Sequence, residues 1–186
     1  MRQILFIQGG GGHDVHDNWD DKLVDSLRRE LGDGYEVRYP RMPGEDDPNY
    51  ARWAPAIRQE IEEIDDGGMI VAHSIGAAIL MGLIAKRLPE RTLGAIMLVS
   101  APFVGEGGWP GDEFTLPRDL GEKLGAIRVH IFHGSEDDTA PAAHADLYAR
   151  AIPQAEVHKL PGRDHQLNND FSEVAAVVRR LETADA

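Results

Sequence analysis

The chain has 186 residues, 42% of them hydrophobic, which is enough for the core of one domain. Its formal net charge of −13 at pH 7 argues against nucleic acid or an anionic membrane as a partner, because both are polyanions. Without cysteine, the chain forms no disulfide, no thiolate metal site and no cysteine nucleophile.

Short apolar runs rich in Ile and Val alternate with helical patterns, which is typical of βαβ units around a parallel sheet. The pattern predicts strands at residues 2–8, 35–40, 68–73, 94–100, 127–133 and 155–160. It predicts helices at residues 18–31, 50–64, 75–88, 141–151 and 170–182. No repeat or linker interrupts this order, so residues 1–186 are predicted to form a single α/β domain.

The beginning of the chain predicts a strand followed by a helix. The apolar run that ends at Ile7 is too short for a signal peptide, and no run is long enough to cross a membrane, so we expect a cytoplasmic protein. Asn18 is predicted to cap the first helix, and Gly32 to end it. Trp19 is a candidate for the wall of a substrate pocket, but packing of the first helix into the core is the favoured interpretation.

Residues 72–76, Ala-His-Ser-Ile-Gly, lie between an apolar strand and a helix of small residues. This is the context of the G-x-S-x-G turn, which holds a nucleophilic serine on a strained backbone. The positions two before and two after the serine must be small, and Ala72 and Gly76 meet that demand. Ser74 is therefore a candidate nucleophile, and the alternative is a serine that only caps the helix.

An acid and a base follow Ser74 in the chain. Asp137 comes directly after the strand predicted at 127–133, and His165 follows the strand predicted at 155–160. The order Ser, Asp, His is that of α/β-hydrolases, and the carboxyl ends of parallel strands share one edge of the sheet. Asp138 competes with Asp137 for the role of the acid.

Three motifs give the chain a family resemblance: residues 72–76, His-Gly-x-x-Asp-x-x-x-Pro at 133–141, and Gly-x-x-His at 162–165. With them it resembles the small, nearly lidless serine hydrolases of the α/β-hydrolase superfamily, such as the retinoblastoma-binding serine hydrolase. The resemblance implies a three-layer sandwich with a mostly parallel six-stranded sheet and a minimal cap. It also implies an acyl-enzyme on Ser74, activated by His165 and Asp137, and no cofactor. Gln8 replaces the usual histidine after the first strand, Ala72 the first glycine, and Ala140 a common valine.

The remaining site residues are assigned by position. Backbone N–H groups of Ile75 and Gly10 are expected to form the oxyanion hole, with Gly9 and Gly11 as alternatives to Gly10. Between residues 100 and 127 the chain has room for only a loop and one helix near 117–124, which excludes a large lid. Phe103 and Trp109 in this segment are expected to bind substrate.

The charge of the segment between residues 100 and 127 predicts a substrate preference, and two histidines have predicted structural roles. The segment carries three acidic residues, Glu106, Asp112 and Glu113. Their negative charge is expected to favour neutral or cationic esters over anionic ones. His133 is expected to position the acid loop, and His73 to point away from Ser74 because strand side chains alternate.

The sequence thus predicts an esterase acting on small carboxylic esters, with amides or thioesters as alternative substrates, and it leaves the oligomeric state open. Two rival functions remain. One is an interaction protein that keeps the fold without catalysis. The other is a metal-dependent hydrolase that uses His13 and His16, although no second cluster completes such a site and we expect no metal.

Overall fold

The computed structural model describes residues 1–184, which form alternating strands and helices. In chain order the elements are β1 (Arg2–Ile7), a π-helical turn η1 (His16–Asp20), α1 (Asp21–Leu31), β2 (Tyr35–Arg38), α2 (Tyr50–Glu63), β3 (Met69–His73), α3 (Ser74–Lys86), β4 (Ala95–Val99), α4 (Leu120–Leu124), β5 (Val129–Gly134), α5 (Ala143–Ala151), β6 (Glu156–Leu160), a 3₁₀ turn η2 (Leu167–Asn169) and α6 (Ser172–Ala184). All six predicted strands and five predicted helices are confirmed, with small shifts at their ends.

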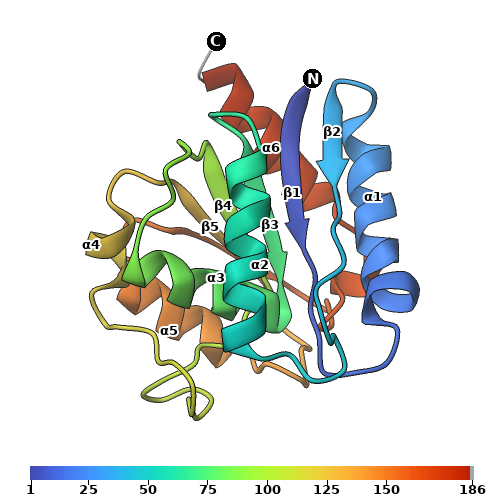
Figure 1. Ribbon diagram of the computed structural model, residues 1–186. Helices are drawn as coiled ribbons and strands as arrows, with labels where there is room; N and C mark the ends of the chain where they lie inside the picture. Colours follow the sequence, from blue (N-terminus) through green and yellow to red (C-terminus); the bar gives the residue numbers. More distant parts are fainter. Residues whose placement is uncertain (185–186) are drawn as a thin grey trace.

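The six strands form one sheet in the order β2-β1-β3-β4-β5-β6, and every neighbouring pair is parallel (Figure 1). The sheet is therefore wholly parallel. The central strands β3 and β4 are buried along their whole length, which explains their continuous apolar sequences. Because the strands run the same way, the segments after β1, β3, β5 and β6 all leave the sheet at one edge.

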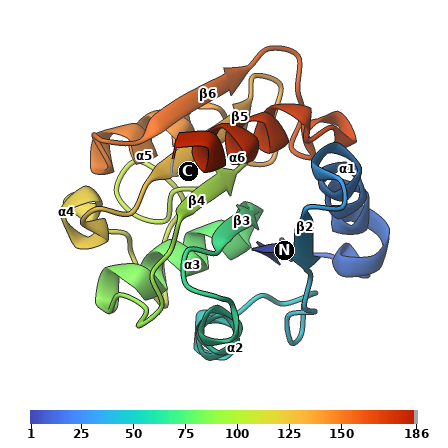
Figure 2. The same cartoon turned by 90° about the horizontal axis from the view of Figure 1, so that it is seen from above.

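Helices cover both faces of the sheet, which gives the three layers expected (Figure 2). One core packs α1 and α6 against the sheet through residues such as Leu27 and Val178. The other core packs α2, α3, α4 and α5 against the opposite face, with Trp53 and Tyr148 among its largest buried side chains.

The start of the first helix differs from the prediction. Residues 16–20 form a π-helical turn, and α1 begins only at Asp21. Asn18 lies inside that turn and does not cap the helix, whereas Gly32 ends α1 with a φ of +72° as expected. Trp19 is 54% exposed and is not a core residue, while the neighbouring Asp20 is fully buried. The wider π turn changes the rotational phase of the helix, so that the aspartate faces the interior.

The connection between β4 and β5 contains a loop and the short α4, so the cap is minimal, as predicted. Within the loop, Val104 forms an isolated bridge with Trp109. Among the described residues, none of the helices is both long and apolar enough to pass through a bilayer.

Candidate active site

Ser74 sits in a strained turn between β3 and α3. It is the first residue of α3 and has a φ of +52°, a conformation that residues other than glycine rarely adopt. A side chain at Gly76 would place its Cβ 2.1 Å from the carbonyl oxygen of Gln8, so β1 passes too close for any larger residue. At Gly76, this contact explains why the residue two positions after the serine must be small.

Side chains from three segments meet at Ser74. The His165 Nε2 atom lies 2.9 Å from Ser74 Oγ, and its Nδ1 atom lies 2.8 Å from Asp137 Oδ2. Asp137 follows β5, and His165 lies between β6 and η2. Because a carboxylate accepts hydrogen bonds, His165 donates from Nδ1 and presents the lone pair of Nε2 to the serine hydroxyl. The three residues form one continuous hydrogen-bonded chain.

The two neighbouring aspartates have different surroundings. Asp137 Oδ1 accepts hydrogen bonds from the backbone N–H groups of Thr139 (3.0 Å) and Ala140 (2.8 Å). Burial opposes its ionisation, but hydrogen bonds from His133 and His165 outweigh it and hold the pKa of Asp137 well below its usual range. Asp138 is exposed, and its Oδ1 atom lies 3.5 Å from the hydroxyl of Thr139. The structure thus brings Asp137, and not Asp138, to the site.

His133 supports the loop that carries the acid. Its Nε2 atom lies 2.6 Å from the carbonyl oxygen of Ala140, to which it donates, and 3.3 Å from Asp137 Oδ2. The ring is buried beneath the loop, in agreement with the positioning role expected for it.

In the glycine loop after β1, the N–H groups on either side of Gly10 both have acceptors. The N–H of Gly9 donates to Asp20 Oδ2 (2.7 Å), and the N–H of Gly11 donates to the carbonyl of Glu45 (2.8 Å). Among the described residues, the N–H of Gly10 between them has no hydrogen-bond partner. A Cβ on Gly10 would lie 2.9 Å from both Glu45 and Trp53, which explains the glycine.

Gln8 anchors this loop from below. It is fully buried, its amide donates to Glu45 Oε2 (2.7 Å), and its Oε1 accepts from the N–H of Met42 (2.8 Å). The second expected donor, the N–H of Ile75, belongs to the first turn of α3, where backbone N–H groups have no partner within the helix.

A cleft of about 600 Å³ opens above Ser74. It is lined by Gly9, Gly10, Gly11, Gly12, His13, Val15, Trp19, Pro48, His73, Ser74, Ile75, Trp109, Thr139, His165 and Gln166. Trp109 lines this cleft, and so does Trp19, for which the core was the favoured of two interpretations. Phe103 does not line this cleft: it packs edge-on against Tyr148 at 5.2 Å and borders a separate pocket.

The acidic residues of the β4–β5 connection also lie outside this cleft. Glu106 forms an ion pair with Arg118. Glu113 accepts hydrogen bonds from the side chain of Asn49 and the backbone N–H of Tyr50 at the start of α2. None of these carboxylates lines the cleft itself, but Asp112 and Glu113 line an adjoining pocket that shares Ile75 and Trp109 with it. The expected discrimination against anionic esters therefore stays a prediction that rests on these neighbouring charges and on the net charge of the chain.

Two groups that the sequence interpretation did not assign to the site lie beside the triad. His73 Nδ1 is 3.0 Å from Asp20 Oδ2, and His73 Nε2 is 3.0 Å from the carbonyl oxygen of His165. Strand alternation does place His73 on the face of α1 and α6, but the backbone of His165 lies on that face. One signal was present: Asp20 is in phase with the buried stripe of Leu23, Val24 and Leu27.

The histidines proposed for the rival metal site do not form a three-ligand group in the described part of the chain. His16 stacks on Tyr39 at 3.9 Å, and its two nitrogens lie 2.6 Å from Asp17 Oδ1 and 3.2 Å from the carbonyl of Tyr39. His13 is exposed at the rim of the cleft.

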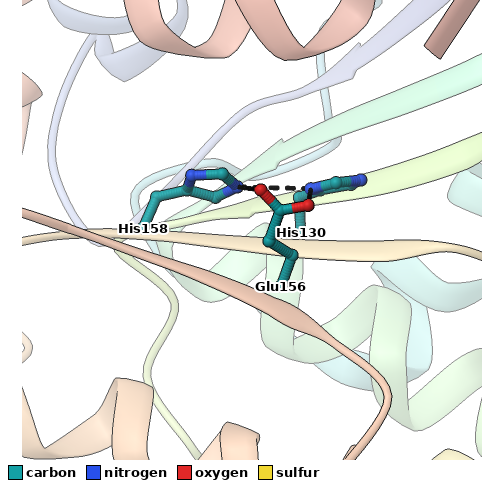
Figure 3. A group of neighbouring side chains, drawn as sticks. All are labelled: His130, Glu156 and His158. Carbon is teal, nitrogen blue, oxygen red and sulfur yellow. Dashed lines mark hydrogen bonds and ion pairs between the residues drawn. The ribbon is translucent and has the colours of Figure 1, made fainter. Parts of the chain in front are cut away.

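A different histidine group lies on β5 and β6, away from the cleft (Figure 3). His130 Nδ1 is 3.2 Å from His158 Nε2, and Glu156 lies 3.6 and 3.5 Å from these two atoms. This spacing would suit a tetrahedral metal ion. However, Arg180 binds both oxygens of Glu156, at 2.8 and 2.9 Å. The carboxylate is already paired with a cation, so the group is explained as a hydrogen-bonded cluster under α6.

Comparison with solved structures identifies the fold. The ydeN gene product from B. subtilis is 17% identical, with a TM-score of 0.78 over 98% of this chain and 100% of that chain. The meta-cleavage product hydrolase CumD from Pseudomonas fluorescens is 12% identical, with a TM-score of 0.77 over 100% and 92% of the two chains. A monoacylglycerol lipase from Paleococcus ferrophilus is 14% identical, with a TM-score of 0.63 over 96% and 93%. These likenesses show the α/β-hydrolase fold.

Comparison of the sequence with protein families identifies the family. A search of curated proteins finds no match to the chain. The family model described as serine hydrolase matches residues 8–182, which is nearly the whole sequence. The chain therefore belongs to the serine hydrolase family.

Proposed function

We propose that this protein hydrolyses small carboxylic esters through an acyl-enzyme on Ser74. The observation that carries the proposal is the continuous hydrogen-bonded chain from Ser74 Oγ through His165 to Asp137. It lies at the floor of an open cleft, and the serine is the first residue of a helix, so the N–H groups of α3 face the reacting atoms.

In the proposed mechanism each group has one task. His165 Nε2 takes the hydroxyl proton while Ser74 Oγ bonds to the ester carbonyl carbon. Asp137 holds the imidazole in the required tautomer and stabilises its cation. The N–H groups of Ile75 and Gly10 donate to the oxyanion of the tetrahedral intermediate.

Collapse of that intermediate breaks the bond to the alcohol oxygen, which receives the proton from His165. A water molecule then repeats the sequence on the acyl-enzyme, with His165 as base, and releases the carboxylic acid and free Ser74.

The lining of the cleft supports the proposed class of substrate. Backbone and aromatic groups dominate its lining, with Trp19 and Trp109 as its largest side chains. Apolar rings favour neutral acyl or alcohol groups, and without a cap domain the cleft stays open to solvent. We therefore place small neutral esters ahead of amides and thioesters.

A serine substitution tests the proposal directly. We expect Ser74→Ala to lower kcat for a short-chain nitrophenyl ester by at least about 10⁴-fold and to abolish covalent labelling by a fluorophosphonate probe. Ser172→Ala, on α6 and outside the cleft, is the control and should keep both activities. The assay panel should include matched amides and thioesters, which rank the substrate classes.

The same experiment separates the rivals. Folded wild-type protein that neither hydrolyses an ester nor reacts with the probe would be an interaction protein. Activity that survives Ser74→Ala but is lost with a chelator, or with His13→Ala and His16→Ala, would indicate metal-dependent hydrolysis.

A further inference from the structure

We infer that the buried Asp20–His73 pair positions the catalytic loops, and that His73 does so as a doubly protonated imidazolium. The inference rests on the proposed function, because it concerns how Ser74, His165 and the glycine loop keep their places. The pair is separate from the Asp137–His165 pair and takes no part in the proton transfers described above.

The pair joins three segments that are distant in sequence. Asp20 ends η1, and His73 is the last residue of β3, directly before the nucleophile. His73 holds the carbonyl oxygen of His165 at 3.0 Å. Asp20 accepts from the N–H of Gly9 at 2.7 Å and from the amide of Gln166 at 3.4 Å. One buried pair thus connects the glycine loop, the nucleophile turn and the loop that carries the base.

The hydrogen-bond partners determine the protonation state of His73. A main-chain carbonyl can only accept a hydrogen bond, so Nε2 must carry a proton. An ionised carboxylate can also only accept, so Nδ1 must carry a second proton toward Asp20. Two fixed donors favour the ionised form of Asp20, because the N–H of Gly9 and the amide of Gln166 both donate to its carboxylate.

Electrostatics supports this arrangement. The side chains of Asp20 and His73 are 0% and 2% exposed, and burial disfavours an isolated charge on either of them. Although burial lowers the pKa of His73, attraction to Asp20 and their hydrogen bond outweigh it, and the pKa is raised above its ordinary value. Conversely, the cation on His73 outweighs burial and lowers the pKa of Asp20. A buried pair of this kind is costly to break from one side.

The consequence for catalysis is positional. The carbonyl held by His73 belongs to the residue whose Nε2 must stay 2.9 Å from Ser74 Oγ. The N–H held by Asp20 belongs to Gly9, directly before the proposed oxyanion donor. Loss of either hydrogen bond would allow the base or the oxyanion donor to move from its position. A displacement of about 1 Å can lower the rate about 10²-fold.

Nuclear magnetic resonance tests the protonation state. We expect ¹⁵N-labelled protein at pH 7.5 to show protons on both ring nitrogens of His73, in the wild type and in Ser74→Ala alike. A His73 ring with one protonated nitrogen would overturn the imidazolium assignment. This measurement needs no substrate and no substitution in the pair.

Two substitutions of His73 test the positioning role. His73→Leu removes the donor to the carbonyl of His165, whereas His73→Gln retains an N–H group that can reach it. We expect kcat to fall about 10²-fold in His73→Leu with KM within about threefold, and His73→Gln to recover most of the loss. Rates should be expressed per site that reacts with the fluorophosphonate probe, so that unfolded protein does not count.

The outcomes are distinguishable. Wild-type kcat in folded His73→Leu, or equal losses in the Leu and Gln variants, would overturn the positioning role. Should His73→Leu fail to fold, the Gln variant and the resonance measurement decide. A wild-type protein without esterase activity would instead defeat the proposed function, and the resonance measurement would still decide the state of the pair.

Discussion

Asp137 and Asp138 are neighbours in the chain, yet the fold gives them opposite environments. Asp137 is buried against His165 and two backbone N–H groups, and Asp138 faces solvent. We expect Asp137→Asn to lower kcat by about 10⁴-fold, because an amide at this position favours the wrong imidazole tautomer. Ester hydrolysis by the two single variants measures the difference.

Asp138→Asn is the matched control and should retain kcat within about twofold of the wild type, since exposed substitutions seldom matter. A comparable loss of kcat in both variants would mean that the loop does not select Asp137 over Asp138 as the partner of His165. Such a result would contradict the assignment of Asp137.

The triad residues could be predicted from sequence because the chemistry demands particular residue types at strand ends. Ser74, Asp137 and His165 each follow an apolar run that reads as a strand, and the parallel sheet brings those ends together. For the buried pair, the sequence offered only the helical phase of Asp20, and nothing local marked His73. The role inferred for His73 depends on its contact with a backbone carbonyl 92 residues away in the chain, and no local sequence pattern predicts that contact.

At the scale of elements, the closest approach in the nucleophile turn is between β1 and α3. A Cβ at Gly76 would meet the Gln8 carbonyl oxygen at 2.1 Å, so Gly76→Ala must push α3 or β1 aside. We expect a loss of about 1–3 kcal/mol in the free energy of unfolding, measured by urea denaturation, together with reduced labelling of Ser74.

Gly34, before β2, provides the control for that substitution. A Cβ there would meet nothing within 4 Å, and its φ is not positive. Gly34→Ala should therefore leave labelling unchanged and keep or slightly raise stability, by up to about 1 kcal/mol. Equal stability of the two variants would show that α3 is not packed this tightly against β1.

The types of the elements could be predicted because strands and helices have different hydrophobic periods. Which side chains of the first helix face the interior could not be predicted. The sequence predicts one continuous helix over residues 18–31, and an α-helical period leaves both Trp19 and Asp20 near the apolar stripe. The π-helical turn η1 decides between them, and it turns Asp20 inward and Trp19 to the cleft. Phe103 was misplaced for a related reason: loop residues have no period from which burial can be derived.

At the scale of the whole molecule, buried histidines make stability depend on pH. Burial lowers the pKa of His144 and His158, and it lowers the pKa of His130 to about 4. The unfolded chain binds protons at these residues from about pH 6.5 downward, whereas the folded chain does not. The free energy of unfolding should therefore fall as the pH drops from about 6.5 toward 4.

His130, in the cluster of Figure 3, should contribute up to roughly 3 kcal/mol of this loss. Urea denaturation between pH 7 and pH 4.5 measures it. His130→Gln should flatten the pH dependence, and the exposed His13→Gln should not. Identical slopes for the wild type and His130→Gln would contradict the prediction.

The ion pair between Arg2 at the start of β1 and Glu182 near the end of α6, with Nε and Oε1 2.9 Å apart, has a practical consequence. The start of β1 and the last turn of α6 therefore lie at the edge of the sheet opposite Ser74 (Figure 1). A bead, a reporter domain or a circular-permutation linker joined at either end would consequently leave the mouth of the cleft unobstructed.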